Sequence, residues 1–247
     1  MLVFHKLLPQ LNHGVSKVET VLDNEINLLL KQHPQLSMNT ENNGYVVNGQ
    51  FVLNHEYNNI PLYEEYEIKI YIPFNFPCDF PLVWEVSNKI PKNFGHLCSK
   101  GELCLGVNCE IANFLNKHPS LIRYIDELVV SYLYAATYYK KYGKFPYGER
   151  SHGVKGIMEY YLDFWNVKEE RSVITLLHLV CLFKYSKLTP LPWKINEKPI
   201  EKDYNKEKFK EIFNSALYDY YIVDYYQLKK YYFTRLGLYG IHRKKDC

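Results

Sequence analysis

The chain has 247 residues, of which 47% are hydrophobic and 23% are charged, a composition that excludes extensive disorder and allows either one large or two small domains. Its formal net charge of +3 is too small to predict a polyanionic partner, and the excess of basic residues falls after Lys187. The N-terminus lacks the features of a secretory signal, and no apolar run reaches the roughly 18 residues of a membrane-spanning helix, so we expect a cytoplasmic protein without membrane contact.

Six cysteines are spread along the chain at irregular intervals. Because disulfides are rare in the cytoplasm, we expect free thiols, with catalysis or metal binding as their special uses. The intervals between Cys98, Cys104 and Cys109 do not match the Cys-x-x-Cys spacing of structural zinc sites. The sequence therefore predicts no metal site and no cofactor. The alternative is a fortuitous zinc site in which His96 is one of the ligands.

Apolar residues at steps of three and four predict a helix over residues 15–32, which Pro34 ends. A polar loop rich in Asn follows the helix. The next segment, residues 45–54, is β-prone and contains Asn48-Gly49, a favoured two-residue turn. This segment is predicted to be either a hairpin or a single bulged strand.

Alternation of apolar and polar residues predicts half-buried strands over residues 66–72 and 82–86. Three prolines, four residues apart, lie between these strands. They exclude helix and remove backbone donors, which predicts a rigid, extended crossover. Residues 89–106 show no long periodicity, so we expect an irregular flap at the edge of the sheet.

The strongest helical periodicity in the chain covers residues 121–141, and Gly143 and Pro146 end it. Only helical segments are predicted after this point, and they cover residues 157–165, 172–185 and 206–235. The last of them carries tyrosines and leucines at helical steps along one face. Together the elements predict an α+β domain over residues 1–147 and an all-helical extension over residues 148–247.

The order of the predicted elements and two short motifs resemble the ubiquitin-conjugating enzyme family over residues 15 to about 141. One motif is the proline-rich crossover, and the other is a histidine followed, after a loop, by Gly-x-Leu-Cys-Leu. The residues that carry both motifs are Ile72, Pro73, Phe76, Pro77, Pro81, His96, Gly101, Leu103, Cys104 and Leu105. The resemblance implies an antiparallel meander with flanking helices. It also implies a cysteine transferase, in which Cys104 receives the C-terminal carboxyl group of another protein as a thioester and passes it to an acceptor.

The helical extension and Gly-Glu-Arg-Ser-His-Gly at residues 148–153 resemble stand-alone bacterial conjugating-enzyme-like proteins. Those proteins belong to antiphage (CBASS) operons that also contain a cGAS-like nucleotidyltransferase. The resemblance implies that the carried partner is this nucleotidyltransferase and that the transfer serves antiviral defence. A conjugating enzyme for a bacterial ubiquitin-like protein is the alternative, and the acceptor and the oligomeric state stay open.

The family follows its histidine with Pro-Asn, and that Asn is implied to support amine transfer, whereas this chain has Leu97 and Cys98. Backbone N–H groups, Ser99 or Asn108 are the candidates for oxyanion support, because such a site needs a fixed donor rather than one residue type. Cys98 is also the fallback nucleophile. His96 is implied to support the flap through its ring hydrogen bonds, and a general base is the alternative role.

Two other classes of function compete with the transferase. From its apolar flanking residues alone, Cys104 is typical of a small buried hydrophobe, and the chain would then be a noncatalytic binding module of the same fold. Basic residues interleaved with aromatic ones near the C-terminus are typical of a nucleic-acid adaptor, but we do not expect nucleic acid to be the main partner.

A second polar cluster consists of Glu149, Arg150 and His152. Its residues are interpreted either as contacts to a partner or to the flap, or as a turn between helices in which Arg150 pairs locally.

Overall fold

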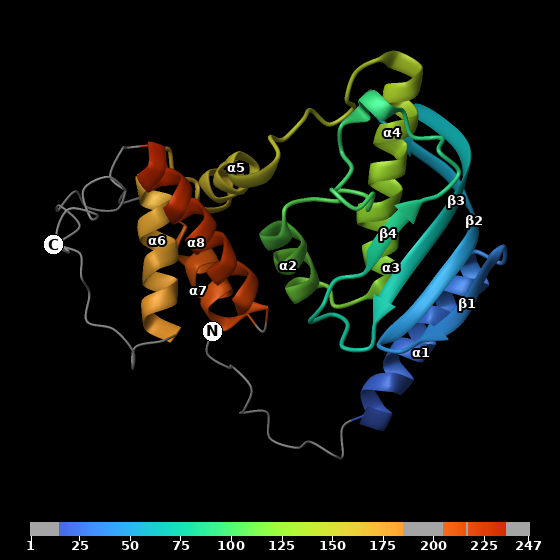
Figure 1. Ribbon diagram of the computed structural model, residues 1–247, viewed down its shortest axis with the longest axis horizontal. Coiled ribbons are helices and arrows are strands. Elements are labelled where there is room, and N and C mark those ends of the chain that lie inside the picture. The colour runs from blue at the N-terminus through green and yellow to red at the C-terminus, as the bar shows by residue number, and fades with distance from the viewer. Residues whose placement is uncertain (1–14, 185–204, 216, 236–247) are drawn as a thin grey trace, which may run out of the picture. The chain divides into compact units, whose positions relative to one another are not determined.

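The computed structural model describes residues 15–184, 205–215 and 217–235. In this part of the chain an antiparallel four-stranded sheet is combined with several helices, which confirms the predicted α+β class (Figure 1). The chain divides into two compact units. Unit 1 contains the described residues of Met1–Gly95, Ser99–Leu103 and Ser120–Lys140, and unit 2 contains those of His96–Cys98, Cys104–Pro119 and Lys141–Cys247.

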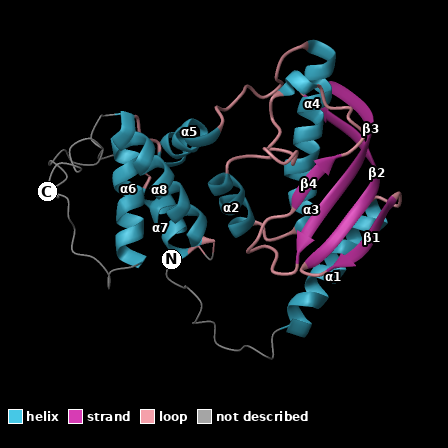
Figure 2. Cartoon of the chain, in the orientation of Figure 1, coloured by secondary structure: helices cyan, strands magenta, loops and turns pink. Residues whose placement is uncertain are grey.

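The strands of unit 1 lie side by side in the order in which they occur in the chain, each antiparallel to the next (Figure 2). They are β1 (Leu36–Glu41), β2 (Gly44–Tyr57), β3 (Ile60–Pro73) and β4 (Leu82–Glu85). One face of the sheet is buried at every second position, as the period of two predicts. Its buried side chains include Val47, Phe51, Leu53, Tyr66, Ile68, Ile70 and Val83.

Two long helical stretches complete unit 1. The first, α1 (Val15–Gln32), covers the residues for which a helix is predicted. The second is continuous from α3 (Leu121–Tyr124) through the π-helical turn η2 (Ile125–Val129) to α4 (Val130–Tyr142), close to the predicted 121–141. Gly143 follows with a φ of +68°, a left-handed conformation that ends a helix and that glycine adopts without strain.

Residues 45–54 belong to one continuous strand, so the hairpin alternative is wrong. Gly49 lies opposite Leu36 in the register of β1 and β2 and has a φ of +140°. A Cβ atom at this position would lie 2.3 Å from the carbonyl oxygen of Gln35. The glycine therefore serves the close approach of the neighbouring backbone rather than a turn.

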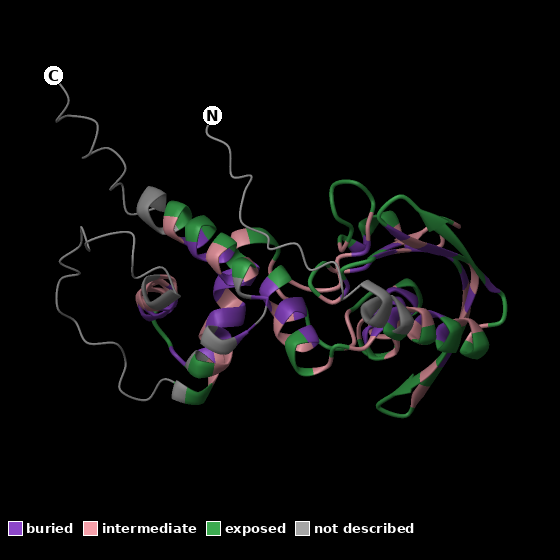
Figure 3. Ribbon diagram, turned by 90° about the horizontal axis from the view of Figure 1, so that it is seen from below, coloured by how far each residue is buried: buried purple, intermediate pink, exposed green. Residues whose placement is uncertain are grey.

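Unit 2 is built from helices, whose buried and exposed sides appear in Figure 3. They are α2 (Asn108–Lys117), α5 (Gly153–Trp165), α6 (Glu170–Lys184), α7 (Lys206–Asn214) and α8 (Tyr218–Arg235). The described residues of the predicted tyrosine-rich face are buried in this unit: Leu217, Tyr221, Tyr225 and Leu228. These side chains form packing surface, as amphipathic periodicity predicts.

The single helix predicted over residues 206–235 is wrong, because the chain breaks between α7 and α8. Ser215 has an extended backbone, with φ of −65° and ψ of 136°, and its hydroxyl accepts a hydrogen bond from the N–H of Leu217 at 3.1 Å. A serine that bonds to the backbone just ahead competes with helix formation and starts a new helix instead.

Among the described residues, no helix combines the length and the apolarity needed to cross a lipid bilayer. Part of the basic excess after Lys187, on which the nucleic-acid alternative depends, lies outside the described residues.

Candidate functional site

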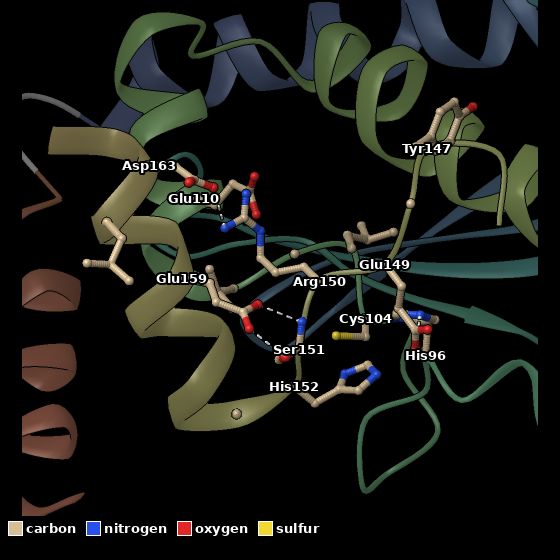
Figure 4. Close-up of a pocket in the computed structure, with 16 residues that line it drawn as sticks. His96, Cys104, Glu110, Tyr147, Glu149, Arg150, Ser151, His152, Glu159 and Asp163 are labelled. Atoms are coloured by element: carbon tan, nitrogen blue, oxygen red, sulfur yellow. Dashed lines mark hydrogen bonds and ion pairs between the residues drawn. The ribbon is translucent and has the colours of Figure 1, made fainter. Parts of the chain in front are cut away.

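A pocket with a volume of about 690 Å³ lies within unit 2 (Figure 4). Three segments contribute to it: the residues around His96, the turn from Cys104 into α2, and the joint between α4 and α5 continuing into α5. The lining residues are His96, Cys104, Leu105, Gly106, Val107, Glu110, Tyr147, Gly148, Glu149, Arg150, Ser151, His152, Gly153, Glu159, Leu162 and Asp163.

Backbone hydrogen bonds fix the segment that carries Cys104. The N–H of Leu103 donates to the carbonyl oxygen of Val83 on β4 at 2.8 Å, and the N–H of Cys104 donates to the carbonyl oxygen of His96 at 3.0 Å. Cys104 is partly exposed, whereas Cys109, the second residue of α2, is fully buried. Of these two thiols, only Cys104 is accessible to a reactant.

His96, Glu149 and His152 gather at the same end of the pocket as Cys104 (Figure 4). The Nε2 atom of His96 lies 3.5 Å from the Oε1 atom of Glu149, and the centroids of the two imidazole rings are 4.5 Å apart. The ring of Phe145 packs edge to face against the imidazole of His96, with 5.1 Å between the two ring centroids. Burial lowers the pKa of His96 and the neighbouring His152 adds to this, while the Glu149 carboxylate opposes it.

The opposite end of the pocket is organised around carboxylates of α5. Glu159 accepts hydrogen bonds from the hydroxyl of Ser151 at 2.7 Å and from its N–H at 2.9 Å, and these bonds lower the pKa of the Glu159 carboxyl. Arg150 Nη1 lies 3.4 Å from the Oδ2 atom of Asp163. Together these contacts hold the joint before α5 against the middle and the last turn of that helix.

Gly156 permits this arrangement. A Cβ atom at residue 156 would lie 1.9 Å from the carbonyl oxygen of Ser151, a distance that two non-bonded atoms cannot adopt. The joint therefore passes against the bare backbone of α5, which a larger residue would prevent.

The pocket is acidic overall. Its lining contains the carboxylates of Glu110, Glu149, Glu159 and Asp163, together with the guanidinium group of Arg150. Burial raises the pKa of the Glu110 carboxyl, and the charge of Arg150 partly offsets this effect. Such a lining favours cationic ligands, because a low-dielectric cleft with one sign of charge concentrates the opposite sign.

The structure brings two of the sequence-predicted site residues together, since Cys104 and His96 line the same pocket. Asn108 is exposed at the first residue of α2, and Cys98 is exposed, and neither belongs to the lining. The ring of His96 contacts residues 145–152, whereas its backbone carbonyl accepts the hydrogen bond from Cys104.

Both interpretations of the second polar cluster have a counterpart in the structure. Arg150 pairs locally with Asp163, as expected for a turn between helices, while Glu149 and His152 contact His96. Glu159 and Asp163, for which the sequence predicts no role, stand four residues apart on α5. That interval places two carboxylates on one face of a helix and was a signal available in the sequence.

No protein-family model, no curated protein and no solved structure matches this chain. The chemistry of the pocket is what remains to indicate a function. An accessible thiol beside two imidazoles and several carboxylates is a set of groups suited to nucleophilic catalysis, since the thiol supplies the nucleophile and its neighbours can exchange protons.

Proposed function

We propose that the chain is a ubiquitin-conjugating-like transferase, in which Cys104 carries the C-terminus of a partner protein as a thioester. The observation that carries the proposal is the position of Cys104, partly exposed and in the same pocket as His96, Glu149 and His152. A buried, inert cysteine would not line such a pocket.

The order of elements also supports the proposal. A helix, a four-stranded antiparallel meander in sequential order, an irregular segment containing the cysteine and then further helices follow one another along the chain. This is the order that the resemblance to the ubiquitin-conjugating enzyme family implies. Fold alone does not establish an activity, so the activity is proposed from Cys104 and the side chains around it.

The proposed reaction has two steps. In the first, the thiolate of Cys104 attacks the carbonyl carbon of an activated C-terminus, supplied as an acyl adenylate or as a thioester on another protein, and the donor's leaving group departs. In the second, an acceptor nucleophile attacks the carbonyl carbon of the thioester, the C–S bond breaks, and Cys104 leaves as a thiolate. The acceptor loses its proton to a base or to water.

The resemblance to antiphage proteins names the partner for the proposed reaction, a cGAS-like nucleotidyltransferase. The acidic lining favours a cationic acceptor, because an ammonium group is attracted to the carboxylates before it loses its proton. An amine is therefore the acceptor class that we propose.

The proposal predicts that the chain and its activated partner form a covalent adduct that a thiol reductant cleaves. Replacing Cys104 by Ala should abolish the adduct, because no other side chain of the pocket forms a thioester. Intact-protein mass spectrometry measures the adduct, with and without reductant. Cys98→Ala is the matched control and should retain it, since Cys98 is exposed but does not line the pocket.

An adduct of undiminished yield in Cys104→Ala would contradict the proposal. If no adduct forms and iodoacetamide fails to modify Cys104 in the folded protein, the noncatalytic binding module becomes the better interpretation. Modification of Cys104, with protection of the buried Cys109, is the result expected for an accessible nucleophile.

A further inference from the structure

The end of the pocket that contains His96, Glu149 and His152 presents three potential metal ligands in close proximity. One donor atom from each residue can be chosen so that all lie within 4.8 Å of one another. His96 comes from the segment after the short 3₁₀ turn η1 (Lys92–Phe94), whereas the other two residues come from the joint before α5. Residues about 50 positions apart thus converge on one point.

The donor types match those of zinc sites. Two imidazoles and one carboxylate, with a further coordination position left for water or substrate, form a set that Zn²⁺ uses in catalytic sites. Harder cations such as Mg²⁺ and Ca²⁺ prefer oxygen ligands, so the two imidazoles favour a zinc-class ion. The acidic character of the rest of the pocket adds a favourable field for a divalent cation.

The geometry requires only small movements to close around an ion. Zn–N and Zn–O bonds of about 2.0 to 2.2 Å place neighbouring donor atoms roughly 3.5 Å apart in a tetrahedral site. The distance of 3.5 Å between Nε2 of His96 and Oε1 of Glu149 is already of this size. The side chain of Glu149 is 51% exposed, which leaves it free to adjust its rotamer, whereas that of His96 is only 17% exposed and provides a fixed ligand.

We propose that His96, Glu149 and His152 form a binding site for a Zn²⁺ ion in the pocket that contains Cys104. This site is independent of the transferase proposal, because it depends on these three side chains and not on any acyl transfer. Cys104 does not belong to the group of mutually close donor atoms, so the site has three protein ligands.

The test is a titration of the full chain with Zn²⁺ by isothermal calorimetry, after treatment with EDTA and in a reductant that contains no thiol. We expect one ion per chain with a dissociation constant of about 1 μM or below. His152→Ala and Glu149→Gln should each weaken binding at least about tenfold, because each removes one of three ligands. Both residues are exposed, so thermal unfolding curves without metal should coincide with that of the parent protein.

Two controls locate the ion. His118→Ala removes a histidine elsewhere in unit 2, and Cys104→Ala removes the thiol, and both variants should bind Zn²⁺ within about threefold of the parent. The proposal is overturned if the parent binds no Zn²⁺ below about 100 μM, or if His152→Ala and Glu149→Gln both bind as the parent does. Complete loss of binding in Cys104→Ala would overturn the assignment of three ligands.

A second measurement does not depend on calorimetry. Because a ligand that binds only the folded state raises stability, Zn²⁺ should raise the thermal midpoint of the parent and not that of His152→Ala. An equal rise in both proteins would place the ion elsewhere and contradict the proposal.

Discussion

Asp224 is a carboxyl group buried inside unit 2, only 2% exposed. It accepts a hydrogen bond from the hydroxyl of Tyr161 on α5 at 3.1 Å, and it lies beside the thiol of Cys109 on α2. Burial raises the pKa of Asp224 to about 6, although the hydrogen bonds from Cys109 and Tyr161 oppose this shift. The same burial, with Asp224 as a neighbour, raises the pKa of Cys109 and keeps that thiol protonated.

The raised pKa of Asp224 predicts how stability changes with pH. Below about pH 4 the carboxyl is protonated in both states, and between pH 4 and 6 the unfolded chain loses its proton first, which favours unfolding. The loss amounts to about 3 kcal/mol, since each tenfold difference in proton affinity is worth about 1.4 kcal/mol. Asp224→Asn should therefore remove this contribution to the decline in the free energy of unfolding between pH 4 and 7. Urea denaturation at a series of pH values measures that decline.

Asp219 provides the control for this experiment, because it is an exposed aspartate on the same helix, α8. Asp219→Asn should leave the pH profile of stability as it is in the parent. If the profile of Asp224→Asn also superimposes on that of the parent, the carboxyl of Asp224 does not titrate in this range and the prediction is wrong.

Single residues differ in how far the sequence identifies them. The sequence predicts Cys104 as a site residue because it stands in a short motif. It also indicates Glu149 and His152 as members of a polar cluster, because they lie close together in the chain. Their contact with His96 cannot be predicted, since it depends on how the joint before α5 folds back. Nothing in the sequence indicates that Asp224 is buried, because an acidic residue in a helix is exposed far more often than buried.

Glu25 shows how one element fixes the start of another. This side chain of α1 accepts hydrogen bonds from the N–H groups of Leu121 at 2.6 Å and Ile122 at 3.1 Å, and from the hydroxyl of Ser120 at 3.0 Å. It therefore satisfies N–H groups that a helix N-terminus leaves without intrahelical partners, and its charge is favourable at that end of the helix dipole.

Replacing Glu25 by Ala should destabilise the protein by about 1 to 2 kcal/mol, the usual cost of losing an N-terminal cap. The shift in the midpoint of urea denaturation measures this cost. Glu127→Gln is the matched control, because Glu127 forms an exposed pair with Arg123 and should cost no more than about 0.5 kcal/mol. Equal effects of the two substitutions would show that Glu25 does not act as a cap.

The elements that the sequence predicts closely are those with strong periodicity, such as α1 and β4, whereas the alternation predicts only residues 66–72 of β3. Two elements were missed for physical reasons. In β1 only Leu36 is buried and the other five residues are exposed, so the strand has no alternation to detect. In α2 the N-cap residue is Val107, which makes no side-chain hydrogen bond, so the usual signal for a helix start is absent.

At the scale of the whole chain, α2 is the element that links the cysteine segment to the C-terminal helices. It directly follows the turn that carries Cys104, and it belongs to unit 2. Its buried side chains Cys109, Ala112 and Leu115 are fully enclosed, and Lys117 pairs with Glu211 of α7 at 2.8 Å. The boundary between residues 147 and 148 stays a prediction, which a truncation can test.

A fragment of residues 1–147 lacks α5 to α8, so the apolar side of α2 would face water. Since burial of that side stabilises a short helix, we expect the amides of α2 to exchange hydrogen at least about tenfold faster than in the full chain. Mass spectrometry of hydrogen exchange measures this, and the amides shared by β2 and β3 provide the internal control, because their ladder lies within unit 1. Unchanged protection of α2 in the fragment would instead favour a self-contained domain that ends at residue 147.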